Sequence, residues 1–179
     1  MPARRAFPIG HSTPTLDAFA ALLEGHGVRR VADVRRFPGS RRHPQFNREA
    51  LAAGLAARGI GYAHVEALGG RRSVVPGSSN GGWENAAFRG YADHMASATF
   101  AAGLAELEAL AAAEPTAVTC AEALWWQCHR RLVADALVVR GWAVDHIGPD
   151  GELAAHALTP FAAVQDGRVA YPSAQLRLA

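Results

Sequence analysis

Residues 116–141 read TAVTCAEALWWQCHRRLVADALVVRG, and they contain both cysteines of the chain. The first six residues are short, apolar or β-branched, as is typical of a buried strand. From Cys128 onward, apolar residues recur at helical spacing until Gly141, a residue that commonly ends helices. A strand, a polar loop and a helix in this order are the repeating unit of a parallel α/β sheet.

The same alternation occurs on both sides of this stretch. Glycines, prolines and capping residues divide the chain between the segments. Strands are expected at 6–10, 28–34, 60–65 and 142–148, a loop followed by a helix at 11–27, and helices at 47–59, 84–95 and 100–113. The sequence therefore predicts a single α/β domain over 1–179, with a layered, Rossmann-like, mostly parallel sheet flanked by helices. Its core is expected at about 7–148, followed by a C-terminal extension at 149–179.

Composition sets limits on the class of protein. With 179 residues, half of them apolar, the chain is long enough for one sizeable core. It has no apolar run of about 18 residues, and its first residues lack the apolar stretch of a secretory signal, so a cytoplasmic protein is expected. A net charge of +2 does not by itself indicate a polyanionic partner. In a reducing compartment, two close cysteines are more often a thiol or ligand pair than a disulfide.

Polar and titratable residues follow the predicted strands. In open parallel sheets, ligands bind beyond the carboxyl ends of the strands, so these residues are expected to share one cleft. A solvated rim without function is the alternative. The acid–base candidates are His11, Asp33, Glu122 and His129, with Cys128 as the candidate nucleophile.

Arginines are concentrated in the same loops, and guanidinium groups bind phosphate through two parallel hydrogen bonds. Alternatively, they pair with carboxylates and tie the loops together. The predicted phosphate-binding residues are Ser12, Arg35, Arg41, Arg42, Arg71 and Arg130.

The two cysteines are expected to do different jobs. Cys120 ends a buried strand, which favours simple packing. Cys128 precedes His129 at a helix start, where the partial positive charge of the helix lowers the pKa of a thiol. Zinc bound by Cys120, Cys128 and His129 with Glu122, His11 or His146 is a weaker alternative, because the short CxxC spacing is missing. No metal is assigned.

Several blocks occur in a fixed order: IGHS, DVRRFPGSRRHPQFN with LGG behind it, WENAAFRGYADHM, and CAE followed by CHR and HI. From about Phe7 to Pro172, this set resembles a bacterial family of unknown function, the domain of unknown function 488. Trp125 departs from the pattern, since members often have proline there. The resemblance implies an α/β fold and a functional rim, and it supplies no reaction.

These observations predict a protein that binds a phosphate-bearing small molecule or nucleic acid and performs hydrolase- or transferase-type chemistry on it. One alternative is a nucleic-acid-binding or regulatory module without catalysis, and another is a thiol or metal sensor. Neither GxxxxGKS nor GxGxxG is present, so the sequence indicates no cofactor, and it indicates no membrane partner or oligomeric state.

Overall fold

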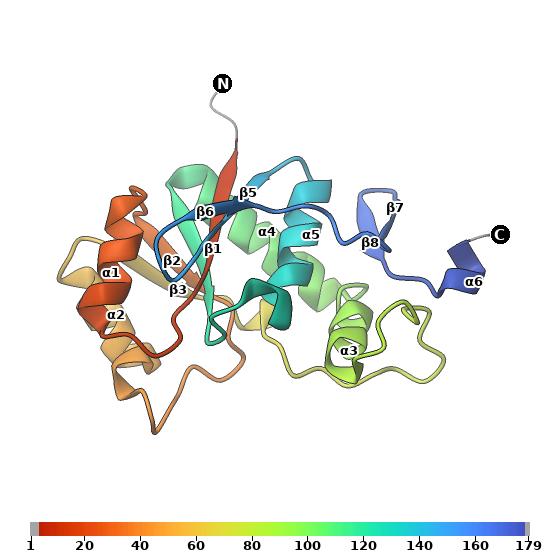
Figure 1. Cartoon of the computed structure of the whole chain (residues 1–179), viewed down its shortest axis with the longest axis horizontal. Coiled ribbons are helices and arrows are strands. Elements are labelled where there is room, and N and C mark those ends of the chain that lie inside the picture. Colours follow the sequence, from red (N-terminus) through yellow and green to blue (C-terminus); the bar gives the residue numbers. More distant parts are fainter. Residues whose placement is uncertain (1–3, 178–179) are drawn as a thin grey trace.

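The computed structural model describes residues 4–177 and confirms the predicted α/β fold (Figure 1). Its main sheet has six strands in the order β3-β2-β4-β1-β5-β6, and a separate hairpin pairs β7 with β8. The strands are β1 (Arg5–Gly10), β2 (Arg30–Asp33), β3 (Gly61–His64), β4 (Thr116–Cys120), β5 (Ala143–Ile147), β6 (Leu153–Ala155), β7 (Ala163–Gln165) and β8 (Arg168–Ala170).

Helices connect the parallel strands, and several begin at a side-chain cap. Thr15, Asn85 and Ser97 each accept hydrogen bonds from amides of the helix that follows. The helices are α1 (Leu16–Gly25), α2 (Arg48–Ala56), α3 (Ala86–His94), α4 (Ala98–Ala113), α5 (Arg130–Val139) and α6 (Ala174–Arg177), with 3-10 turns η1 (Pro44–Phe46), η2 (Glu66–Leu68) and η3 (Trp125–Gln127).

The residue before α2 makes a different contact. Asn47 occupies the capping position but makes no side-chain bond to a helix amide. Its amide oxygen accepts instead from the Ser40 backbone amide at 2.5 Å. The side chain thus fixes the loop after β2 to the start of α2.

Two apolar cores lie on opposite faces of the sheet, because successive strand residues point to opposite sides. On β4, Ala117 belongs to the core shared with α1 and α2, whereas Val118 and Cys120 belong to the core shared with α4 and α5. Both cores contain many fully buried side chains, including Phe19 and Leu107. The sheet is therefore covered on both faces, as parallel sheets require.

The register aligns the carboxyl ends of the central strands. β4 pairs in parallel with both β1 and β2, which places Cys120 beside Gly10 and Thr119 beside Asp33. Only β6 runs antiparallel within this sheet, against β5. The loops after β1, β2 and β4 consequently emerge at one edge.

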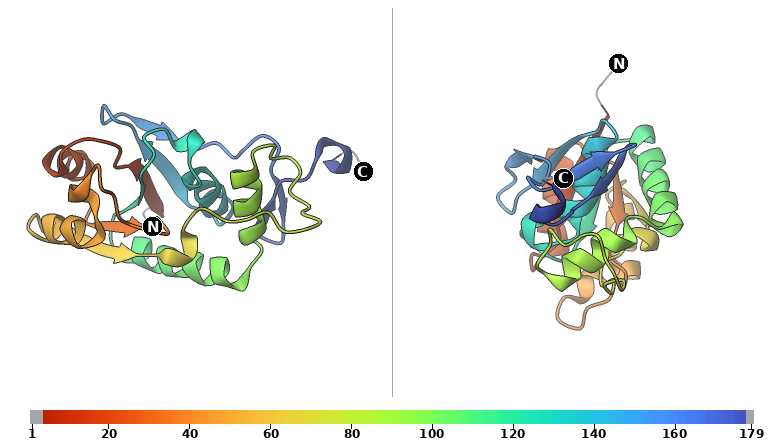
Figure 2. Two further views of the ribbon diagram at one scale, coloured as in Figure 1. Left: turned by 90° about the horizontal axis from the view of Figure 1, so that it is seen from below. Right: turned by 90° about the vertical axis from the view of Figure 1, so that its right-hand side faces the viewer.

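The segment after β5 returns to the domain. The short β7–β8 hairpin lies beside α5 (Figures 1 and 2), and Tyr171 and His156 from this segment are buried. Residues 178 and 179 of the expected extension 149–179 lie outside the described residues.

Within residues 4–177, no single helix has the length and apolar character needed to cross a membrane, although the bent pair α3 and α4 meets those criteria jointly.

Candidate functional site

A cavity of about 670 Å³ opens at the carboxyl ends of β1, β2 and β4. This is where an open parallel sheet places its ligand sites. The lining comes from five segments: His11, Ser12 and Thr13; Arg35, Arg36, Phe37, Gly39, Ser40 and His43; Gly70 and Arg71; Ala87, Phe88 and Tyr91; and Cys120, Ala121, Glu122, Ala123, Gln127, Cys128 and His129.

The loop after β1 is fixed to the loop after β4. The His11 amide donates to the Cys120 carbonyl at 2.9 Å, which continues the β1–β4 ladder beyond the strands. Gly10 is required at this crossing, because a Cβ there would collide with the Glu122 carbonyl group. Ser12 then has a positive φ of 46°, a left-handed conformation that costs energy for residues other than glycine. The chain thus holds a strained residue at the cavity wall.

Asp33 forms the centre of a buried network below the cavity. Its carboxylate is 0% exposed and accepts from Arg35 Nε at 2.9 Å and Nη2 at 2.6 Å. It also accepts from the Tyr62 hydroxyl at 2.6 Å. Burial, followed by the nearby carboxylate, raises the pKa of Tyr62, so this hydroxyl stays a donor. Because its oxygens are saturated, Asp33 acts here as a counter-ion and positions Arg35.

His11 is held in the neutral form. An arginine only donates, so Arg35 Nη1, 3.2 Å away, donates to Nε2, and the opposite nitrogen donates to the Ser12 carbonyl at 3.0 Å. Burial lowers the pKa of His11 to about 4. The ring also stacks on Phe46 at 4.3 Å between centroids. Both nitrogens are therefore occupied, and His11 supports the wall of the cavity.

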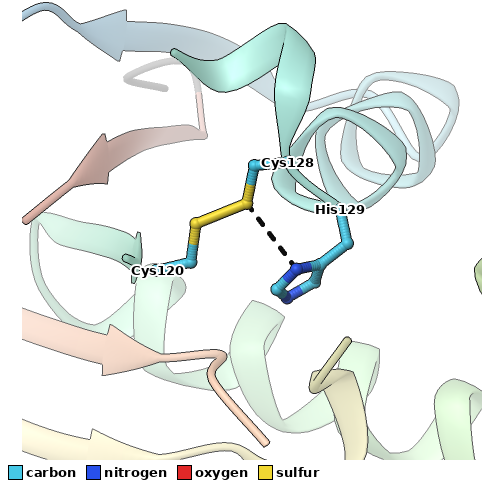
Figure 3. A group of neighbouring side chains, drawn as sticks. All are labelled: Cys120, Cys128 and His129. Atoms are coloured by element: carbon cyan, nitrogen blue, oxygen red, sulfur yellow. Dashed lines mark hydrogen bonds between the residues drawn. A yellow bond between two sulfur atoms is a disulfide. The ribbon is translucent and has the colours of Figure 1, made fainter. Parts of the chain in front are cut away.

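Cys120, Cys128 and His129 meet at the floor (Figure 3). The two sulfur atoms are joined as a disulfide, and the His129 Nδ1 lies 3.6 Å from Cys128 Sγ. Both cysteines are almost fully buried. Cys120 packs in the core, as expected, and β4 and the loop before α5 also bring its sulfur to that of Cys128.

The start of α5 also contacts Cys128. The residue is extended, with φ −127° and ψ 150°, so α5 begins two residues after it, later than expected. This geometry lets the Arg130 amide donate to Cys128 Sγ at 3.4 Å. An amide at a helix start stabilises negative charge on a thiolate. This contact would favour a thiolate at Cys128 in the reduced protein.

The Arg130 side chain has a structural position. It is 1% exposed and does not line the cavity. Its Nη2 donates to the Glu122 carbonyl at 2.5 Å. Burial lowers its pKa to about 10, which leaves it charged at neutral pH. Arg130 thus holds the β4–α5 loop in place.

Two other arginines reach the cavity without a carboxylate partner. Arg36 donates from Nη1 to the Arg71 carbonyl at 2.9 Å, and its guanidinium lies over the Phe37 ring at 5.4 Å. Within residues 4–177, neither Arg36 nor Arg71 forms an ion pair. Arg71 has a positive φ of 57°. Gly69 allows the two loops to approach, since a Cβ there would lie 2.6 Å from the Arg36 Cα.

The predicted site residues fall into three groups. His11, Ser12, Arg35, Arg71, Glu122, Cys128 and His129 line the cavity. Asp33 and Arg130 are buried behind it. Arg41 and Arg42 are exposed and are absent from the lining. Sequence reasoning did not select Arg36 or Tyr62, although Arg36 lies in the quoted RRFPGSRR block.

A second buried network lies outside the cavity. Asp135 on α5 is 0% exposed and accepts from His156 Nε2 at 2.8 Å and from the Tyr171 hydroxyl at 2.7 Å. His156 Nδ1 and His146 Nε2 share a hydrogen bond at 2.9 Å, and Trp125 stacks on the His146 ring at 4.4 Å. This network fastens the C-terminal segment to α5.

In a comparison with family models, the domain of unknown function DUF488 matches residues 15–137, most of the chain. This range includes Arg35, Arg71, Cys128 and His129, and it leaves out β1 and everything after α5. No curated protein and no solved structure matches the chain.

Proposed function

The chain belongs to the DUF488 family, and we propose that its cavity binds a phosphate-bearing ligand and carries out hydrolase- or transferase-type chemistry on it. The observation that carries this proposal is the position of Arg36 and Arg71, two guanidiniums without an ion-pair partner among residues 4–177, beside a cavity that is also lined by Cys128 and His129. We further propose that the protein works in the cytoplasm, where thiols are kept reduced.

Charge is the first support. Of the arginines that line the cavity, Arg35 is neutralised by Asp33, whereas Arg36 and Arg71 form no ion pair with any residue that the structure describes. The lining contains one carboxylate, Glu122. The net charge of the lining is therefore positive. It comes from arginine, the residue type best suited to bind phosphate oxygens through paired N–H groups.

Size and aromatic lining are the second support. Ligand pockets commonly have volumes of about 300–1,000 Å³, and this cavity falls in that range. Phe37, Phe88 and Tyr91 contribute ring surface to its wall. Such surfaces stack on the flat organic part of a nucleotide. A nucleotide therefore matches both the cationic and the aromatic parts of the lining.

The chemical groups on the floor are the third support. Asp33 and His11 have their polar atoms occupied, as described above. In contrast, His129 uses only Nε2 in a bond to the protein backbone, at 2.8 Å from the Val34 carbonyl, and the sulfurs beside its Nδ1 also line the cavity. Reaction chemistry is therefore assigned to Cys128 and His129, with the exposed Glu122 carboxylate as a further acid–base candidate.

A nucleic-acid-binding module without catalysis is the second candidate. Phe37 is 61% exposed at the cavity edge, and Trp126 is 45% exposed on the β4–α5 loop. Together with exposed Arg41 and Arg42, these rings could bind single-stranded nucleic acid by stacking and phosphate contacts.

Calorimetric titration of the reduced protein with inorganic pyrophosphate and a panel of nucleotides tests the proposal. The Arg36→Ala/Arg71→Ala variant should lose about tenfold or more in affinity, because each charged hydrogen bond contributes about 1.5–3 kcal/mol. Arg41→Ala/Arg42→Ala is the matched control, since it removes the same charge outside the cavity.

Equal losses in the two double variants would reject the cavity as the anion site. A loss confined to the Arg41/Arg42 variant, with a salt-dependent affinity for single-stranded nucleic acid, would favour the binding module. Turnover of phosphate esters that disappears in Cys128→Ser would support the chemistry, and turnover that persists unchanged would contradict it.

A further inference from the structure

The floor of the cavity brings together three atoms that zinc prefers as ligands. Cys120 Sγ, Cys128 Sγ and His129 Nδ1 all lie within 4.8 Å of one another. Thiolate sulfur and imidazole nitrogen are the usual zinc ligands in proteins. The three residues come from the end of β4 and the start of α5, so the fold itself sets their proximity.

The hydrogen bonds of His129 leave the required nitrogen available. A carbonyl oxygen only accepts, so the contact with Val34 O at 2.8 Å places the proton of the neutral ring on Nε2. The lone pair on Nδ1 then points toward the sulfurs. Metal-binding histidines characteristically donate their second N–H to a carbonyl or carboxylate in this way.

The backbone spacing of the cysteines also suits a shared ion. Their Cα atoms are 7.7 Å apart, beyond the range of about 4.4–6.8 Å usual for disulfides. With Zn–S bonds of about 2.3 Å, two thiolates on one tetrahedral zinc stand nearly 4 Å apart, which a wider backbone separation accommodates.

We infer that Cys120, Cys128 and His129 form a zinc site of the open kind, with three protein ligands and a remaining position facing the cavity. Structural zinc sites are closed by a fourth protein ligand, whereas catalytic sites leave one position for water or substrate. Here the three ligand residues line the cavity. In this arrangement Cys128 is a metal ligand, and the nucleophile is a zinc-bound water.

Loading the site requires the reduced protein. A dithiol reductant transfers two electrons to the Cys120–Cys128 disulfide, is itself oxidised to a disulfide, and leaves two thiols. Binding of Zn²⁺ then displaces one proton from each thiol, so affinity rises with pH. Bound zinc supplies a water with a pKa near neutrality. Its use against a phosphate ester at Arg36 and Arg71 rests on the proposed function, whereas metal binding does not.

Titration of the reduced, metal-free full chain with Co²⁺ under anaerobic conditions tests the site. The expected result is one cobalt per chain, with tetrahedral ligand-field bands and thiolate-to-cobalt charge-transfer absorption, both lost when Zn²⁺ is added. Absence of stoichiometric, thiolate-bound cobalt in the wild-type protein would overturn the inference, and this result depends on no variant.

Variants then identify the ligands. Cys120→Ala, Cys128→Ser and His129→Gln should each lower zinc affinity by at least about tenfold in competition with a chromogenic chelator. His94→Gln is the matched control, because His94 is likewise partly buried and donates to a backbone carbonyl, that of Ala67, at 2.7 Å. Unchanged affinity in the three ligand variants, or an equal loss in the control, would reject the assignment.

Pyrophosphate titration of the zinc-free protein separates the two proposals. Zinc binding without anion binding refutes the proposed function but supports the metal site. Anion binding without thiolate-bound cobalt refutes the metal site and returns Cys128 to the role of nucleophile.

Discussion

Two fully buried carboxylates organise this molecule, and they support different parts of it. Asp33, at the end of β2, binds Arg35 and Tyr62 directly below the cavity. Asp135, within α5, binds His156 and Tyr171 and fastens the C-terminal segment. Each carboxylate accepts several hydrogen bonds, and each network contains a buried histidine whose pKa is lowered. The comparison shows that a buried titratable cluster does not identify a site unless its neighbours face a cavity.

Removing either carboxylate should cause the largest loss in the free energy of unfolding. Asp33→Ala and Asp135→Ala each leave buried partners unpaired, so both should lower the free energy of unfolding by about 3–5 kcal/mol. Urea denaturation at pH 7 measures this loss. If either variant is as stable as wild type, that network does not hold the fold.

The same two variants should differ in ligand binding. Asp33→Ala leaves Arg35 without its counter-ion at the cavity wall, so pyrophosphate affinity at low salt should rise. Asp135→Ala should leave that affinity unchanged, because its partners do not line the cavity. Identical shifts in both variants would remove the distinction between the networks.

Acid should destabilise both networks through their histidines. Burial lowers the pKa of His11 to about 4 and that of His146 to about 3, against about 6.5 in the unfolded chain. Between these values the unfolded state binds more protons, so stability is complete above pH 6.5 and is lost as pH falls toward 4. Each histidine contributes a slope of up to about 1.4 kcal/mol per pH unit.

Unfolding free energies measured at intervals from pH 7 to pH 4.5 test this dependence. His11→Gln and His146→Gln should each flatten the profile. If the free energy of unfolding falls as steeply with pH in both variants as in the wild-type protein, other groups control acid unfolding.

A substitution at Gly70, next to the proposed zinc ligand His129, should lower zinc affinity to an intermediate extent. A Cβ on Gly70 would lie 2.9 Å from His129 Nδ1. Gly70→Ala should therefore displace the imidazole and weaken zinc binding by about tenfold, the lower end of the effect of groups around a metal ligand. Chelator competition measures the change. Gly25→Ala is a control for an added methyl group, since Gly25 has open space around it, has no positive φ and lies outside the cavity lining.

The smallest effect is expected at the exposed arginines. Arg41→Ala/Arg42→Ala removes two side chains that lie outside the cavity lining, so the free energy of unfolding should change by no more than about 0.5 kcal/mol. Urea denaturation measures it. A loss above about 1 kcal/mol would indicate that these arginines hold the loop after β2 in place.

The sequence predicts the sheet because strand and helix periods alternate cleanly from Arg5 to Ile147. It also predicts that the residues after β1, β2 and β4 gather at one edge, since parallel strands end together. It does not predict β6, β7 or β8, because strands of three residues are too short to show a period.

The contacts made within the site are also hard to predict from the sequence, because they join residues that are far apart along the chain. Asp33 and His11 carry the residue types of acid–base catalysts, but only the fold shows that Arg35 and Tyr62 occupy their polar atoms. Asp135 lies in an apolar helical run, and its partners come from residues 156–171, a separation that local patterns do not report. The contact between the two cysteine sulfurs likewise depends on how the β4–α5 loop closes.

The most direct test of the central claim is a crystal structure of the reduced protein soaked with tungstate, an electron-dense analogue of phosphate. We expect an anomalous peak inside the cavity, contacted by the guanidiniums of Arg36 and Arg71 and facing Cys128. A tungstate bound only at Arg41 and Arg42, or a cavity without anion in a crystal that binds tungstate elsewhere, would show that the cavity is not the anion site.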